Sequence, residues 1–178
     1  MCSSDLVEGS MVIAPVKVPG GGIYVGDVHA MMGDGEIAGH TADVSAEVVL
    51  EVKVIKGLGL DGPIVLPVKE DLPDIVRPRT EEELGVARLL ACSHGFELED
   101  DSLPVQMVGS GANLNVAADN ALERDLGLPE VRNRCTITGQ AEIGRFPGVV
   151  HVSMLVPRTI LKRKGLQEII ARHYGVEN

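Results

Sequence analysis

An alternating segment from Val44 to Lys56 constrains the fold of this chain more than any other feature. Apolar side chains occupy every second position from Val44 to Val54, and most intervening positions are polar or charged. Residues two apart in an extended chain point to the same side. The pattern therefore predicts a β-strand with one buried face and one mostly solvated face.

Shorter apolar runs bounded by glycine or proline extend the β pattern. Prolines flank the run 63–68, which indicates an edge strand because proline cannot donate to a ladder. The runs concerned are 10–18, 23–28, 63–68, 104–108 and 149–156.

Helical patterns begin after residue 79. Thr80 and Glu83 have the spacing of a capping box, and Gly95 is expected to end the helix that they begin. Asn113 or Asn115 is suited to cap the next helix. Further helices are predicted up to about Leu126, from Pro129 to about Arg134, and from Thr159 to Tyr174.

Runs of strands that precede runs of helices are typical of the α+β class. We therefore predict an α+β fold with a β-rich, sandwich- or barrel-like N-terminal half and a mixed α/β C-terminal half. The corresponding regions are 1–70, which carries an acidic loop with a histidine, and 71–178, which ends in a helix. We expect the two regions to form one intertwined structural unit.

Charge and composition exclude two classes of partner. The chain has 26 acidic and 16 basic residues, a net charge of -10, which repels nucleic acid and anionic membrane surfaces. Aromatic residues make up only 2%, which leaves no platform for stacking bases. An acidic cleft would instead suit a cation.

Cysteine usage and the N-terminus predict a cytoplasmic protein. Cys2, Cys92 and Cys135 are odd in number and far apart, which argues against a disulfide framework and a thiolate zinc site. The N-terminus lacks a signal-peptide pattern, and the apolar runs are too short to span a bilayer. Because a predicted strand follows Met1 almost at once, we expect a fragment or a shortened protein.

The loop after Val25 carries the best candidate site. Asp27, His29, Asp34 and Glu36 are all groups that bind divalent cations. Asp27 and His29 share a side if the chain stays extended, and nearby glycines let it fold back. The set suits Zn²⁺ best, with Ca²⁺, Mg²⁺ or Mn²⁺ as alternatives.

A bound metal here would polarise an amide carbonyl and activate water. Glu36 reaches further than Asp34, so it is the preferred proton carrier, with Asp34 as the second candidate. The competing interpretation is an ordinary acidic turn beside a surface histidine. Elsewhere, Gly109-Ser110-Gly111 is better explained as a strand-to-helix turn, and the roles of His40 and His151 stay open.

The stretch 26–36, Gly-Asp-Val-His-Ala-Met-Met-Gly-Asp-Gly-Glu, resembles the acetamidase/formamidase family. The stretches 15–21, 44–47, 131–139 and 148–157 are similar to the same family, so the likeness covers nearly the whole chain. The resemblance implies that members are longer at the N-terminus, so we expect this chain to be a shortened member or a fragment.

The resemblance implies hydrolysis of short aliphatic amides to a carboxylate and ammonia, a bound divalent metal and a homo-oligomer. It carries over Asp27, His29, Asp34 and Glu36, which match the family motif position by position. Of these we expect Asp27, His29 and Glu36 to be metal ligands and Glu36 with Asp34 to be catalytic. Two alternatives remain: a catalytically inactive homologue that acts as a structural or small-ligand-binding protein, and hydrolysis of a different C–N bond.

Overall fold

Two long antiparallel strands, β3 (Ser102–Ser110) and β5 (Val149–Pro157), form the centre of the structure. The computed structural model describes residues 6–32, 41–76, 79–127, 134–142 and 148–177, and for 140–142 it describes the backbone alone. A five-stranded sheet has the order β1-β2-β3-β5-β4, and every neighbouring pair is antiparallel. Its other strands are β1 (Met11–Ile13), β2 (Ile64–Leu66) and β4 (Thr136–Glu142).

Three helices cover one face of this sheet. They are α3 (Leu114–Leu126), α5 (Arg158–Arg163) and α6 (Gln167–Tyr174). Alternate residues of β3 and β5, such as Met107 and Met154, are fully buried against helix residues such as Ile160 and Ile170. The remaining helices are η2 (Lys69–Asp71), α1 (Leu72–Ile75) and α2 (Glu81–Ser93). An antiparallel sheet with helices on one face confirms the predicted α+β class.

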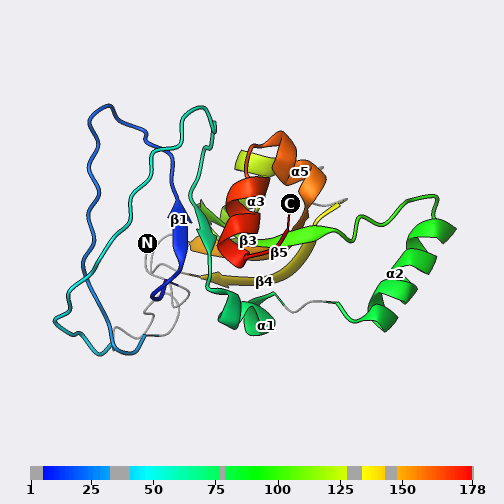
Figure 1. Ribbon diagram of the computed structural model, residues 1–178, viewed down its shortest axis with the longest axis horizontal. Helices are drawn as coiled ribbons and strands as arrows, with labels where there is room; N and C mark the ends of the chain where they lie inside the picture. The colour runs from blue at the N-terminus through cyan, green and yellow to red at the C-terminus, as the bar shows by residue number, and fades with distance from the viewer. Residues whose placement is uncertain (1–5, 33–40, 77–78, 128–133, 143–147, 178) are drawn as a thin grey trace.

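The strongest strand prediction is wrong. Residues 44–56 belong to no strand, and the runs 10–18 and 23–28 contribute only the three residues of β1. We call residues 14–32 and 41–60 the arm; it extends to one side of the sheet in Figure 1, blue to cyan. Its alternation is real, but a strand also needs a hydrogen-bonded neighbour, and none of the described residues supplies one along 45–56.

The prediction of an edge strand at 63–68 is also wrong. β2 lies inside the sheet between β1 and β3, and all three of its residues are buried. Pro63 and Pro67 flank the paired residues without interrupting them. Proline therefore limits the length of this strand and not its place in the sheet.

The predicted C-terminal helix 159–174 is two helices. α5 ends at Arg163, α6 begins at Gln167, and Gly165 between them has a φ of 72°. That left-handed conformation breaks a helix and costs glycine little. The helix predicted from Pro129 falls on residues 128–133, outside the described part of the chain.

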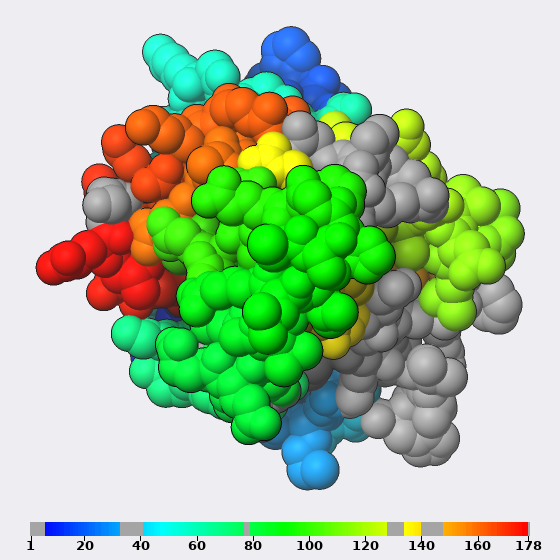
Figure 2. All heavy atoms as spheres, turned by 90° about the vertical axis from the view of Figure 1, so that its right-hand side faces the viewer, coloured from blue at the N-terminus to red at the C-terminus, as the bar shows by residue number. Residues whose placement is uncertain are grey.

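Helix α2 confirms its predicted limits. The Thr80 side chain accepts the Glu83 N–H, the Glu83 side chain accepts the Thr80 N–H, and Gly95 follows the C-cap His94. None of the residues of α2 is buried. Figure 2 views the molecule from the right-hand side of Figure 1 and shows the segment with α2, in green, at the front. No helix among the described residues is long and apolar enough to cross a membrane.

Candidate metal centre

A short antiparallel contact between the two legs of the arm brings His29 and Asp43 opposite each other. The bonds that flank the pair are Ala30 N–H to Ala42 O at 2.8 Å and Val44 N–H to Val28 O at 3.0 Å. This arrangement makes His29 and Asp43 a non-hydrogen-bonded pair, the type in which facing side chains approach most closely. The backbone itself therefore places an imidazole beside a carboxylate.

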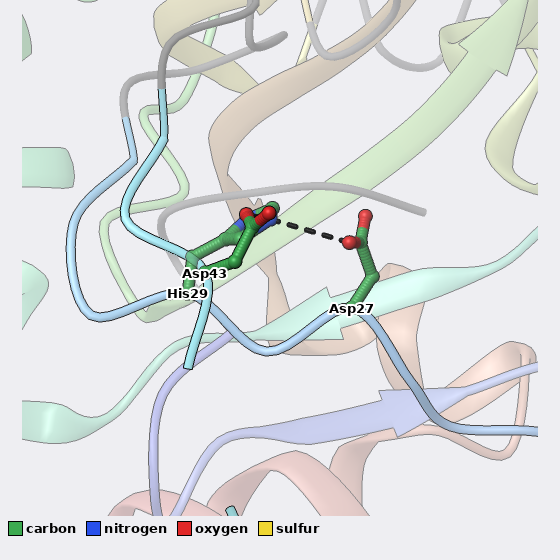
Figure 3. Close-up of side chains that lie close together, drawn as sticks. All are labelled: Asp27, His29 and Asp43. Carbon is green, nitrogen blue, oxygen red and sulfur yellow. Dashed lines mark ion pairs between the residues drawn. The ribbon is translucent and has the colours of Figure 1, made fainter. Parts of the chain in front are cut away.

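Asp27 joins this pair from the same leg as His29. Its carboxylate Oδ1 lies 3.3 Å from His29 Nε2, and Asp43 Oδ1 lies 3.0 Å from the same nitrogen. Asp27 has a φ of 62°, a left-handed conformation that aspartate tolerates better than most residues. The two aspartates therefore converge on one nitrogen, as Figure 3 shows.

The three side chains form a donor set that could hold a cation. One ligand atom from each lies within 4.8 Å of the others, and among the described residues no second group of this kind occurs. The His29 side chain is 6% exposed, whereas those of Asp27 and Asp43 are 74% and 81% exposed. An ion could therefore approach the two exposed carboxylates from solvent and bind His29 Nε2, which belongs to a nearly buried side chain.

Two neighbours orient these groups. His29 Nδ1 lies 3.2 Å from the sulfur of Met32, and Thr41 Oγ1 donates to Asp43 Oδ1 at 2.9 Å. A proton on Nδ1 can be shared with the sulfur, a weak acceptor, which leaves the Nε2 lone pair facing the carboxylates. Outer hydrogen bonds of this kind fix the orientation of metal ligands.

At the base of the arm, its two legs are tied to each other and to α3. Lys17 contacts Asp61 at 2.6 Å, and the hydrogen bond and charge of Lys17 lower the pKa of the Asp61 carboxyl. The buried carboxylate of Asp125, on α3, accepts the N–H of Asp61 at 2.7 Å and of Gly62 at 3.3 Å. These contacts fix where the leg that carries Asp43 returns to the core.

The structure thus brings together part of the predicted site and adds a residue to it. Asp27 and His29 lie side by side, while Asp34 and Glu36 fall outside the described residues. Sequence reasoning missed Asp43, because the motif that carries the other candidates ends at Glu36. The glycines at 33, 35 and 39 were a usable signal: if the chain turns back there, a residue before them, such as His29, lies opposite a residue after them, such as Asp43.

Other sequence candidates have structural roles. Gly109 and Ser110 are the last two residues of β3, paired with Val150 and Val149, and the predicted strand-to-helix turn begins only at Gly111. His151 is buried within β5, and His173 Nε2 lies 2.8 Å from the carbonyl of Pro67. His40 lies outside the described residues.

Comparison with known proteins now bears on this centre. The Acetamidase/Formamidase family matches residues 3–162. The chain belongs to the acetamidase/formamidase family. A Schizosaccharomyces pombe protein named as a putative formamidase is 35% identical over 68 residues, which cover 35% of this chain and 17% of that relative. No solved structure matches the chain.

Proposed function

We propose that this member of the acetamidase/formamidase family hydrolyses short aliphatic amides of the formamide and acetamide type to a carboxylate and ammonia. Family membership supports the reaction class. The observation that carries the mechanism is the convergence of Asp27 and Asp43 on His29 Nε2. The amide, the metal and the assembly of the whole protein are parts of the same proposal.

The donor set fits a divalent metal. One imidazole nitrogen and two carboxylate oxygens suit Zn²⁺ first, with Ca²⁺, Mg²⁺ or Mn²⁺ as alternatives. The three described ligands, Asp27, His29 and Asp43, leave a tetrahedral position for water, as catalytic zinc sites require, provided that Glu36 carries the proton and does not bind the ion. When bound, such an ion would polarise the amide carbonyl and lower the pKa of water.

The side chains of the chain itself would hold and move the proton. We propose Glu36 as the group that takes a proton from water and passes it to the leaving nitrogen, with Asp34 as the second candidate. The roles proposed for Glu36 and Asp34 rest on the sequence motif. The same motif makes Glu36 a candidate metal ligand. His29 would hold the ion from the buried side, and Thr41 would fix the carboxylate of Asp43.

A second candidate is a metal- or small-ligand-binding protein without turnover. The observation that favours it is the exposure of Asp27 and Asp43, at 74% and 81% of the side chain. Hydrolytic centres ordinarily exclude bulk water, which strengthens every electrostatic interaction inside them. A cluster as open as this one would bind a cation without shielding an amide.

Location and assembly complete the proposal. We propose a cytoplasmic homo-oligomer with a small amide as its substrate and without nucleic acid or membrane as a partner. The net charge of -10 supports the exclusion of both polyanionic partners.

Metal binding tests the centre directly. Titration of the chelator-treated chain with Zn²⁺ should show one tight site, and His29→Ala and Asp43→Asn should each weaken it. The loss should exceed about tenfold, since removal of outer-shell partners alone costs about 10–100-fold. Asp74→Asn, at an exposed aspartate in α1, is the matched control and should leave the affinity unchanged.

Ammonia release from a panel of amides tests the reaction. Formamide or acetamide should be hydrolysed, chelator should abolish the activity, and Zn²⁺ should restore it. A chain that binds Zn²⁺ but releases no ammonia from any amide would support the binding protein instead. A chain that binds no divalent metal even in excess would contradict the metal mechanism.

A further inference from the structure

The arm concentrates exposed apolar side chains to a degree that the rest of the described chain does not. Thirteen of the twenty-two exposed large apolar residues in the described part of the chain lie on it. Among them, Val49 is 88% exposed and Val54 is 83% exposed. Exposed apolar side chains gathered on one part of the chain favour an interaction site there.

The backbone of the arm also lacks a partner over its most apolar part. Among the described residues, no backbone hydrogen bond joins 45–57 to another segment. The alternation of this segment is that of a strand, with apolar residues on one side and mixed residues on the other. An unpaired segment with this pattern is a template for pairing with another chain.

We propose that the arm pairs with the arm of a second copy, through antiparallel segments 48–56 related by a twofold axis at Val52. In this register Val52 faces Val52, Leu50 faces Val54, and Val49 faces Ile55. Glu51 of each copy faces Lys53 of the other. Over 49–55 both faces are then matched, apolar against apolar and acid against base, and the end pair, Val48 with Lys56, is mixed.

Charge selects this register over its neighbours. The nearest registers that keep each face of the strand the same are shifted by two residues. In these registers the twofold axis passes through Glu51 or through Lys53. Either choice places two like charges directly opposite each other, which destabilises a strand pair. The axis at Val52 avoids both conflicts.

The same charges explain why two copies of an acidic chain can meet here. The chain carries a net charge of -10, but the segment 44–56 has two glutamates and two lysines. Glu51 and Lys53 contact each other within one chain at 2.7 Å, with side chains 80% and 76% exposed. Both can therefore exchange this local contact for the contact across the axis.

The size of the arm suits such an interface. A stable interface buries about 800 Å² per partner over about 20–30 residues a side. One strand pair is smaller than that, but exposed apolar residues on the first leg of the arm would enlarge it. Those residues are Val16, Val18, Ile23, Tyr24 and Val25.

Analytical ultracentrifugation of the full chain with E51K and K53E tests the pairing. Wild type should sediment as a dimer, and each single variant should raise the dimer dissociation constant about tenfold or more, because opposed pairs become like-charged. An equimolar mixture of the two variants should recover the wild-type constant. In mixed dimers the lysine introduced by E51K faces the glutamate introduced by K53E, and Glu51 faces Lys53.

The double variant E51K/K53E is the matched control and should dimerise like wild type, since it restores opposite charges across the axis. Circular dichroism of each variant checks that the exposed substitutions leave the fold intact. A monomeric wild type overturns the proposal, as does a dimer that neither single variant weakens. No residue of the metal centre is changed, so the result is independent of metal binding and turnover.

Discussion

Gly109, near the end of β3, shows how one residue sets the distance between the sheet and α3. A Cβ atom at this position would lie 2.3 Å from Ala117 O and 2.4 Å from Ala121 N. Both neighbours are backbone atoms of α3, so neither can rotate away. The helix packs as closely as it does because this position has no side chain.

Gly109→Ala should therefore destabilise the protein by at least about 1–3 kcal/mol, the usual cost of overpacking a core. Gly85→Ala is the control, because a Cβ at Gly85 in the exposed helix α2 meets nothing within 4 Å. Alanine is the better helix former, so this second variant should not lower stability. Urea denaturation of both variants measures the difference, and equal effects would contradict the close approach.

The metal centre shows what local sequence reveals at the residue scale. Asp27 and His29 stood out because the motif is continuous and two-residue spacing puts them near each other. Asp43 comes after a glycine-rich stretch and is an unremarkable aspartate in the sequence. Only the pairing of the two arm legs brings it to His29.

At the scale of elements, α2 and α3 have equally clear beginnings and different burial. Thr80 and Glu83 form a capping box at α2, and the Asn113 side chain accepts the Val116 N–H at α3. Capping is a local interaction, so the sequence predicts it. α3 buries its apolar face against the sheet, whereas α2 buries none of its residues.

Removal of the two caps should therefore have different consequences. Asn113→Ala should lower the free energy of unfolding of the whole domain by about 1 kcal/mol, because α3 is part of the core. Thr80→Ala should fray α2 by a similar amount locally and leave the melting temperature nearly unchanged. Amide hydrogen exchange, read helix by helix, together with thermal melts, measures both effects. A large drop in melting temperature for Thr80→Ala would mean that α2 is coupled to the core.

At the scale of the whole molecule, one ion pair joins three separate segments. The Arg134 guanidinium donates to both carboxylate oxygens of Glu99, at 2.6 Å and 2.7 Å, and Thr159 Oγ1 donates to Glu99 at 2.7 Å. The hydrogen bonds from Arg134 and then from Thr159 lower the pKa of Glu99 below its ordinary value. The contact links the segment before β3 to α5 and to the segment before β4.

This pair should make stability depend on pH. A carboxyl with a lowered folded pKa adds stability above its unfolded pKa of 4.5, and that stability is lost as the pH falls through the folded value. Glu99→Gln should reduce this acid dependence and cost about 0.5–1 kcal/mol at neutral pH, since solvent screens a pair that is about one third exposed. Urea denaturation between pH 3 and 7 is the measurement, with the exposed Glu97→Gln as control. An unchanged pH profile in Glu99→Gln would contradict the link.

The sequence by itself determined the local features of this protein. Caps at Thr80 and Asn113, the strand 149–156 and the motif around His29 each depend on residues within a few positions of one another. The tertiary structure decided the rest, because partners for strands and ligands come from distant residues. β2 became an interior strand by acquiring β1 and β3 as neighbours, and Asp43 entered the centre through the pairing of the arm legs. The segment 44–56 is the opposite case, because it has the pattern of a strand but no neighbouring strand among the described residues. Alternation decides which side chains share a face, but it does not provide the strand that must lie beside them.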